Sequence, residues 1–212
     1  MTDTTRILYK LAFKLSILTI IYNLAEGFVG VYFGYSGESL TLFGFGADSF
    51  IEVISGIGIA YMVSRIQQHP QSGRSKLEKT ALTVTGLSFY ALVLGLLATS
   101  VYNLLTGQKP ETTLAGVILS LISIIIMLVL MSTKMKVGKA LNSDPIIADA
   151  RCTKVCVYMS VVLLIASAAY ELTKVAYIDI AGTLALAYLS FNEGRECFEK
   201  VKRNKLCECE NG

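Results

Sequence analysis

Two carboxylates stand four residues apart inside a strongly apolar stretch of the chain. Asp48 and Glu52 belong to the run GADSFIEVISGIGIAYM at positions 46–62. Positions i and i+4 lie on one face of a helix, about one turn apart. Two negative charges placed in this way repel each other unless a cation or shared protons neutralise them. Because acids in such apolar helices are costly and are usually functional, we predict that the pair contacts a bound or transported cation.

The alternative for these acids is an ion pair with a Lys or Arg of a neighbouring helix. We find no Lys or Arg deep within another apolar run, and Lys154, near the edge of one such run, is the nearest candidate partner. The cation-binding interpretation of Asp48 and Glu52 is therefore the favoured one.

A pair of cysteines with the same spacing lies in the second half of the chain. Cys152 and Cys156 belong to the run ADARCTKVCVYMSVVLLIASAA. Cysteine is a small and often buried residue, so ordinary packing explains the pair as well as metal binding does. Two thiolates and two carboxylates from facing helices would supply four ligands, the number that zinc prefers. Thiolate sulfur favours soft ions over magnesium, calcium or manganese.

Three further polar residues are candidates for secondary or gating roles. Asn23 and Glu26 lie in the middle of an apolar run, IYNLAEGFVG. Glu26 fits a gating or proton-path group and a hydrogen-bonded partner of a polar neighbour equally well. Asp149 lies one turn before Cys152 and is interpreted as a solvated acid at a helix start, with a metal ligand near the mouth of the site as the alternative.

The one histidine and the C-terminal thiols give weaker signals. His69 precedes Pro70 in a hydrophilic segment, where a lone histidine is typically solvated. Cys207 and Cys209 belong to the tail sequence CECE, which offers thiols and acids without fixed geometry. Because the cysteines cluster near surfaces expected to be cytoplasmic, we expect free thiols in a reducing compartment.

Long apolar runs must position all of these side chains. The chain has 212 residues, of which 53% are hydrophobic. Apolar runs of about 20 residues recur, the length that crosses ~30 Å of hydrocarbon as a helix. We predict an all-α polytopic membrane protein, a six-transmembrane-helix bundle with spans at roughly 12–34, 40–64, 80–105, 112–133, 147–170 and 176–195. The expected organisation is a cytoplasmic N-terminus at 1–11, a transmembrane domain at 12–195 and a short cytoplasmic tail at 196–212.

The distribution of Lys and Arg predicts the orientation. Of the 19 Lys and Arg residues, all but Lys109 and Lys174 fall on the side of the membrane that carries both termini. Cytoplasmic segments carry the excess of Lys and Arg in membrane proteins. We therefore expect a multi-pass protein of the cell membrane, surrounded by lipid bilayer, with both termini in the cytoplasm.

The motifs that are missing from the sequence narrow the function classes. We find no phosphate-binding glycine loop, no nucleophile beside a histidine and no basic-aromatic pattern of the kind that binds nucleic acid. We expect neither an enzyme nor a resident cofactor nor a nucleic-acid partner. Any uphill transport would then draw on an ion gradient.

The order of four segments resembles that of the cation diffusion facilitator, or cation efflux, family. SLTLFGFGADSFIEVISG resembles the family's second transmembrane helix, and HPQSGRSKLEK resembles its connection between helices two and three. LNSDPIIADARCTKVC is similar to the lead into helix five, and YIDIAGTLALAYLSFNEG is similar to helix six. The resemblance implies a homodimeric divalent-metal/proton antiporter that exports zinc-like ions by alternating access. It also implies a further cytoplasmic domain, which the residues after 195 are too few to form.

The family's metal site takes two acids from helix two and a His and an Asp from helix five. The matching positions are occupied by Asp48 and Glu52, and by Cys152 and Cys156. This match implies that the cysteines are ligands, and the softer donors favour Zn²⁺ or Cd²⁺ as the transported metal, with Hg²⁺ as a further candidate. The alternative function is a non-transporting, metal-responsive membrane module.

Overall fold

The structure is a computed structural model, and it describes residues 3–36, 40–68, 74–106, 114–173 and 177–202. Within these ranges the chain forms six helices and no strand. The helices are α1 (Asp3–Ser36), α2 (Leu40–Gln68), α3 (Arg74–Thr106), α4 (Leu114–Ala140), α5 (Asp144–Thr173) and α6 (Tyr177–Lys202). The predicted all-α bundle of six helices is therefore confirmed.

Several helices extend beyond the spans that hydropathy predicts. α1 begins before residue 12, α4 continues past residue 133, and α6 ends after residue 195. Hydropathy marks only the apolar part of a helix, whereas the backbone hydrogen bonds continue into polar sequence until a turn ends them. This difference matters most for α4, because its extra turns carry Lys134.

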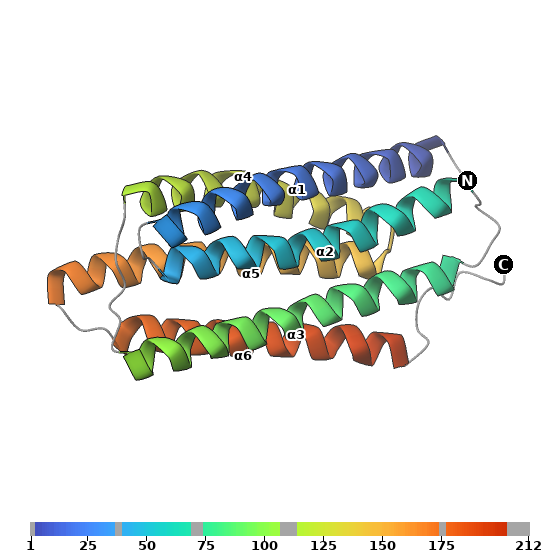
Figure 1. The fold of residues 1–212 in the computed structure, drawn as a ribbon. Coiled ribbons are helices and arrows are strands. Elements are labelled where there is room, and N and C mark those ends of the chain that lie inside the picture. Colours follow the sequence, from blue (N-terminus) through green and yellow to red (C-terminus); the bar gives the residue numbers. More distant parts are fainter. Residues whose placement is uncertain (1–2, 37–39, 69–73, 107–113, 174–176, 203–212) are drawn as a thin grey trace.

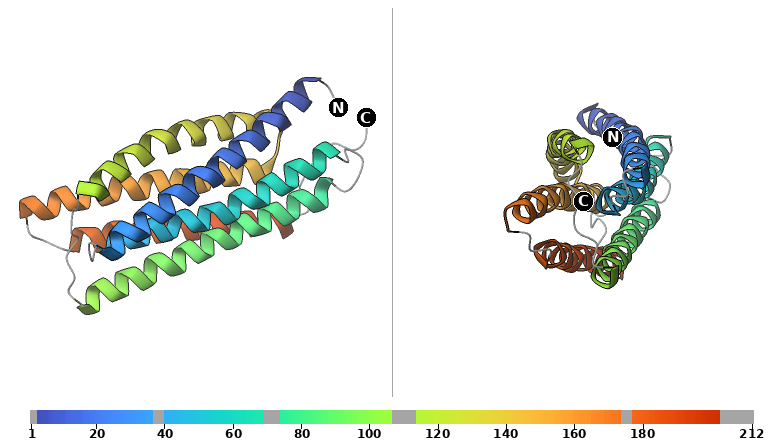
Figure 2. Two further views of the ribbon diagram at one scale, coloured as in Figure 1. Left: turned by 45° about the horizontal axis from the view of Figure 1, so that its top comes forward. Right: turned by 60° about the vertical axis from the view of Figure 1, so that its left-hand side comes forward.

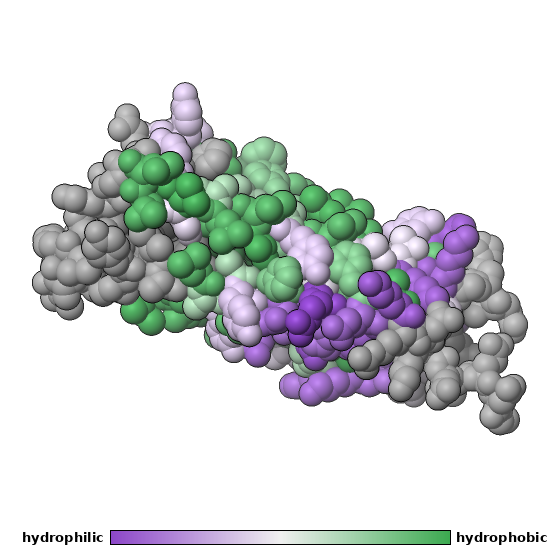
Figure 3. Space-filling model, turned by 90° about the horizontal axis from the view of Figure 1, so that it is seen from below, coloured by the Kyte–Doolittle hydropathy of each residue, from purple (hydrophilic) through white to green (hydrophobic). Residues whose placement is uncertain are grey.

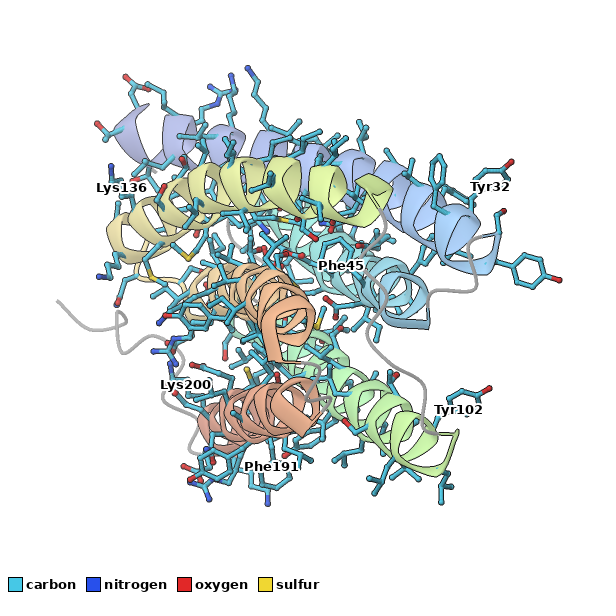
Figure 4. All side chains as sticks on the ribbon, turned by 90° about the vertical axis from the view of Figure 1, so that its left-hand side faces the viewer. Tyr32, Phe45, Tyr102, Lys136, Phe191 and Lys200 are labelled. Atoms are coloured by element: carbon cyan, nitrogen blue, oxygen red, sulfur yellow. The ribbon has the colours of Figure 1, made fainter. Side chains whose placement is uncertain are left out.

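The helices form three layers. α1 and α4 lie on one side, α3 and α6 lie on the other, and α2 and α5 lie between them (Figures 1 and 4). The end view of Figure 2 shows α1 beside α2, and α6 beside α3. The helices that carry the two predicted ligand pairs are therefore the central layer of the bundle.

The outer surface of the bundle is apolar. Exposed side chains include Phe28, Leu94 and Ile125, each more than 60% exposed. On the face shown in Figure 3, apolar residues cover the middle, and hydrophilic residues gather toward the end where α1 begins and α6 ends. Within the described residues, four helices (α1 to α4) are long and apolar enough to cross a membrane. This distribution is typical of a multi-pass membrane protein, in which polar groups lie inside and apolar groups face lipid.

A tight turn joins α4 to α5. Asn142 adopts a left-handed conformation with φ 48°, and Ser143 N donates to Gly138 O at 3.0 Å. Such a residue is typical of helix C-termini, where Gly or Asn reverses the chain. Gly138 allows the two helices to pack closely, because a Cβ there would lie 2.9 Å from Ile147 Cγ1. α5 therefore runs back along α4, and the last turns of α4 face the first turns of α5.

Candidate metal centre

The two predicted ligand pairs lie on facing helices in the interior. Asp48 and Glu52 on α2 are 5% and 1% exposed, and Cys152 and Cys156 on α5 are 1% and 4% exposed. Cys156 Sγ donates a hydrogen bond to Asp48 Oδ2 at 3.2 Å. One acid and one thiol are thus in contact across the α2–α5 interface.

The remaining members of the two pairs, Glu52 on α2 and Cys152 on α5, each lie one helical turn from this contact. Glu52 Oε2 is buried and has no hydrogen-bond partner among the described residues. As the side chains stand, no three His, Cys, Asp or Glu groups of the described ranges are arranged to hold a metal ion. One acid and one thiol are in contact, and whether the four donors ligate a metal stays a prediction.

The donor set fits a particular class of ion. Two carboxylates and two thiols offer oxygen and sulfur in the number that a tetrahedral ion takes. Buried donors that lack full hydrogen bonding, such as Glu52 Oε2, gain most from a bound cation, because an unsatisfied buried oxygen is costly. A borderline or soft divalent ion satisfies both kinds of donor.

Glu26 lies on the α1 side of the same region. Tyr22 OH donates to Glu26 Oε1 at 3.0 Å, and Ser49 Oγ donates to Glu26 Oε2 at 3.0 Å. Glu26 therefore has the hydrogen-bonded polar neighbours that one of its two interpretations requires. Because Ser49 follows Asp48 in the chain, this hydrogen bond connects α1 directly to the helix that carries the acids.

The second polar residue of α1 is fully buried. Asn23 is 0% exposed, and its Nδ2 donates to Thr19 O at 3.0 Å. Its Oδ1 has no hydrogen-bond partner among the described residues. Asn23 therefore presents an unused acceptor inside the bundle, which is compatible with a secondary role.

One expectation from the sequence is wrong. We expected no Lys or Arg deep within another span, but Lys134 on α4 is 2% exposed. Its Nζ lies 2.8 Å from Asp149 Oδ2 and 4.0 Å from Glu52 Oε1. Lys154, the partner that the sequence suggested, is exposed, and its Nζ lies 5.3 Å from the centre of the Tyr158 ring.

The interpretation of Asp149 as a solvated acid is also wrong. Asp149 is 1% exposed, accepts a hydrogen bond from Ser55 Oγ at 2.8 Å and pairs with Lys134.

Hydropathy scores a charged residue as polar wherever it stands, so it assigned the end of α4 to a connecting loop. The continuation of α4 without Gly or Pro from Met131 to Val137 was the signal that could have placed Lys134 inside the helix.

Thr153 is a second residue that the sequence did not single out. It lies between the two cysteines on α5 and is 0% exposed. Its Oγ1 accepts a hydrogen bond from Lys134 Nζ at 3.0 Å and donates one to Glu52 Oε1. One hydroxyl thus links α4, α5 and α2 at the candidate centre.

Ion pairs connect α5 and α6 at the end of the bundle where α5 begins. Arg151 Nη1 lies 3.1 Å from Glu193 Oε2 and 2.5 Å from Glu196 Oε2. Lys200 Nζ lies 2.8 Å from Asp144 Oδ1 and 3.1 Å from Glu196 Oε1. Partial burial raises the pKa of Glu196, but the hydrogen bonds from Lys200 and Arg151 outweigh it and hold this pKa below its usual value.

His69, Cys207 and Cys209 lie outside the described residues. The weaker metal-binding signals at these positions therefore stay predictions.

Comparison with known proteins identifies a family whose profile matches most of the chain. The profile of the cation efflux transmembrane domain matches residues 16–203. A protein of Methanocaldococcus jannaschii described as an uncharacterized transporter is 27% identical over 154 residues, which are 70% of this chain and 54% of that protein. The chain thus spans about half the length of this curated relative.

Proposed function

Because the chain belongs to the cation efflux family, we propose that it exports a divalent transition-metal cation of the zinc or cadmium type through the α2–α5 site, in exchange for protons. The family match and the long apolar helices identify the protein as a multi-pass membrane protein of a cation transport family. The single observation that carries the more specific proposal is the buried contact between the Cys156 thiol and the Asp48 carboxylate.

The donor chemistry supports the choice of metal. Thiolate ligands select zinc, cadmium and mercury over manganese, magnesium and calcium, whereas carboxylates alone would not discriminate in this way. Thiolate ligation by Cys152 and Cys156 would thus restrict the transported metals to borderline and soft ions. Mercury is a further candidate because it is the softest of the three.

The same contact supports exchange for protons. Cys156 uses its thiol proton in the hydrogen bond to Asp48. Only the thiolate binds a metal, so an arriving ion must release this proton. On the more acidic side of the membrane, protons compete with the ion for the same sulfur and oxygen atoms. Alternating access of the site to the two sides then couples export of the metal to import of protons.

Orientation and assembly are part of the proposal. The excess of Lys and Arg on one side supports termini in the cytoplasm of a cell-membrane protein. Resemblance to the family supports a homodimer. Proteoliposomes of known orientation and crosslinking in the membrane would test the two points separately.

Metal flux into proteoliposomes that contain a metal-sensitive dye tests the function. We expect zinc and cadmium flux from the wild type, and a loss of about tenfold or more in Asp48→Ala and Cys156→Ala, the scale on which changes around metal sites act. Cys197→Ala is the matched control: Cys197 is also buried and packs in the same apolar cluster as Cys152, but it lies on α6 and is not one of the predicted ligands. Metal binding without flux in the wild type would instead favour a non-transporting, metal-responsive module.

A further inference from the structure

A buried ammonium group lies beside the candidate metal centre. Lys134 Nζ is 2.8 Å from Asp149 Oδ2, 3.0 Å from Thr153 Oγ1 and 4.0 Å from Glu52 Oε1. A buried charge is tolerated only when it is paired and hydrogen-bonded. Lys134 meets this condition by contacting α5 and approaching α2, so its charge acts on the same side chains that are expected to meet the cargo.

The fold places this ammonium with little freedom. The turn at Asn142 and the close approach of Gly138 to Ile147 hold the last turns of α4 against α5. Asp149 is itself fixed by the hydrogen bond from Ser55 of α2. Lys134 therefore reaches the centre from a third helix that carries none of the predicted ligands.

We propose that Lys134 is a positioning residue that acts as a tethered cation. In the metal-free protein its ammonium pairs with Asp149 and attracts Glu52, and an arriving divalent ion must compete with it for Glu52. This inference rests on the proposed function of the α2–α5 site, and it adds a role for a residue that is not itself a ligand.

Electrostatics gives the tethered cation a consequence for transport. An ammonium near Glu52 repels a second cation in the same low-dielectric surroundings, so it weakens binding of the cargo. The same repulsion speeds release, because Glu52 has an alternative partner when the metal leaves. A site with four strong donors and no competitor would bind its cargo tightly and discharge it slowly.

Replacement of Lys134 by Met tests the proposal, because Met keeps much of the side-chain volume and removes the charge. Lys136→Met is the matched control, since Lys136 lies on the same helix and is exposed (Figure 4). Zinc affinity is measured by competition with a chelator in detergent, and thermal unfolding is measured without metal. We expect Lys134→Met to bind zinc on the order of tenfold more tightly, a usual size for coupling between two ligands.

The Tm of the metal-free protein is a second measurement, and it does not depend on transport. Lys134→Met should lower the Tm of the metal-free protein, since Asp149 loses its partner, and zinc should raise that Tm by more than it raises the wild-type Tm. Flux should show a lower KM together with a lower maximal rate. A purely structural Lys134 would lower the Tm without tightening zinc binding, and this result would overturn the proposal.

A second variant decides the matter if Lys134→Met does not fold. Lys134→Gln removes the charge but keeps an N–H donor for Asp149 and Thr153, so it should hold the metal-free Tm closer to that of the wild type while it binds zinc more tightly. A folded Lys134→Gln variant with wild-type zinc affinity would overturn the tethered cation and leave the proposed function intact. The absence of zinc binding and flux in the wild type would instead contradict the proposed function itself.

Discussion

Cys156 Sγ lies 3.2 Å from Asp48 Oδ2 and donates its proton across the α2–α5 interface. The contact joins a soft sulfur atom to a hard oxygen atom within the central layer of α2 and α5, which lies between the other four helices. Under the proposed function, a metal would take the place of this proton, and the two helices would exchange one bridging group for another when the metal binds. The same contact would then determine both metal selectivity and proton exchange.

Replacement of the cysteines by the residues found at these positions in the family should change selectivity. The double variant Cys152→His, Cys156→Asp exchanges two sulfur ligands for nitrogen and oxygen, which suit zinc better than cadmium. We expect the ratio of cadmium to zinc affinity to fall by at least about tenfold, the scale of even outer-shell changes. Competition binding in detergent measures this ratio, and an unchanged value in a folded variant would refute the ligand assignment of both cysteines.

Removal of the pH gradient should stop transport. If each metal that leaves is exchanged for protons, a protonophore that dissipates the gradient across proteoliposomes removes the driving force. We expect accumulation of zinc against its gradient to collapse, while binding in detergent at fixed pH is unchanged. Zinc flux that persists at its original rate would favour facilitated diffusion down the metal gradient.

The sequence predicted the helices better than it predicted the pairs within them. Hydropathy located six spans because each needs only a long apolar run. The i, i+4 spacing and the family resemblance placed the two acids opposite the two cysteines, but they did not pair individual residues. The sequence analysis did not identify Lys134 and Thr153 as parts of the site, because a hydropathy window does not distinguish a buried polar group from a solvated one. Their roles depend on which faces of α4 and α5 meet, and the turn at Asn142 settles this.

The charged cluster at the ends of α5 and α6 should make stability depend on pH. Glu196 has a folded-state pKa below its usual value, so its contribution is fully present above the unfolded pKa of about 4.3 and is lost as the pH falls through the folded pKa. Because Glu196 is 43% exposed, solvent screening limits this contribution to less than ~1 kcal/mol.

Glu196→Gln should therefore lower the Tm at pH 7 and change it little at pH values below the folded pKa. Glu199→Gln is the control, because the ion pair of Glu199 with Arg195 lies within α6. Thermal unfolding in detergent at both pH values measures the difference. An equal loss of Tm for Glu196→Gln at both pH values would show that the effect does not come from ionisation.

The hydrogen bond between Ser49 and Glu26 should contribute to stability. Ser49→Ala leaves one buried oxygen of Glu26 without its donor, and we expect a loss of about 1–3 kcal/mol. Ser88→Ala is the matched control: Ser88 is as buried as Ser49, but its hydroxyl bonds Val84 O of its own helix. Chemical unfolding measures both variants, and equal losses would mean that the link between α1 and α2 adds nothing specific.

Gly46 should be the glycine that tolerates substitution least. A Cβ at this position would lie 2.5 Å from Val31 N and 2.8 Å from Gly30 C, which are backbone atoms of α1 that cannot turn aside. Gly46→Ala must therefore push α1 away from α2, and we expect it to cost about 1–3 kcal/mol. Small residues at such crossings let membrane helices approach closely.

Gly95→Ala provides the opposite case on α3. A Cβ at Gly95 meets nothing within 4 Å, so the only effect is the better helix propensity of Ala, a gain of up to ~1 kcal/mol. Because α1 reaches the candidate centre through the bond between Glu26 and Ser49, Gly46→Ala should also reduce zinc flux, whereas Gly95→Ala should leave it unchanged. Similar unfolding midpoints for the two variants would show that α1 is free to shift and does not hold α2 in place.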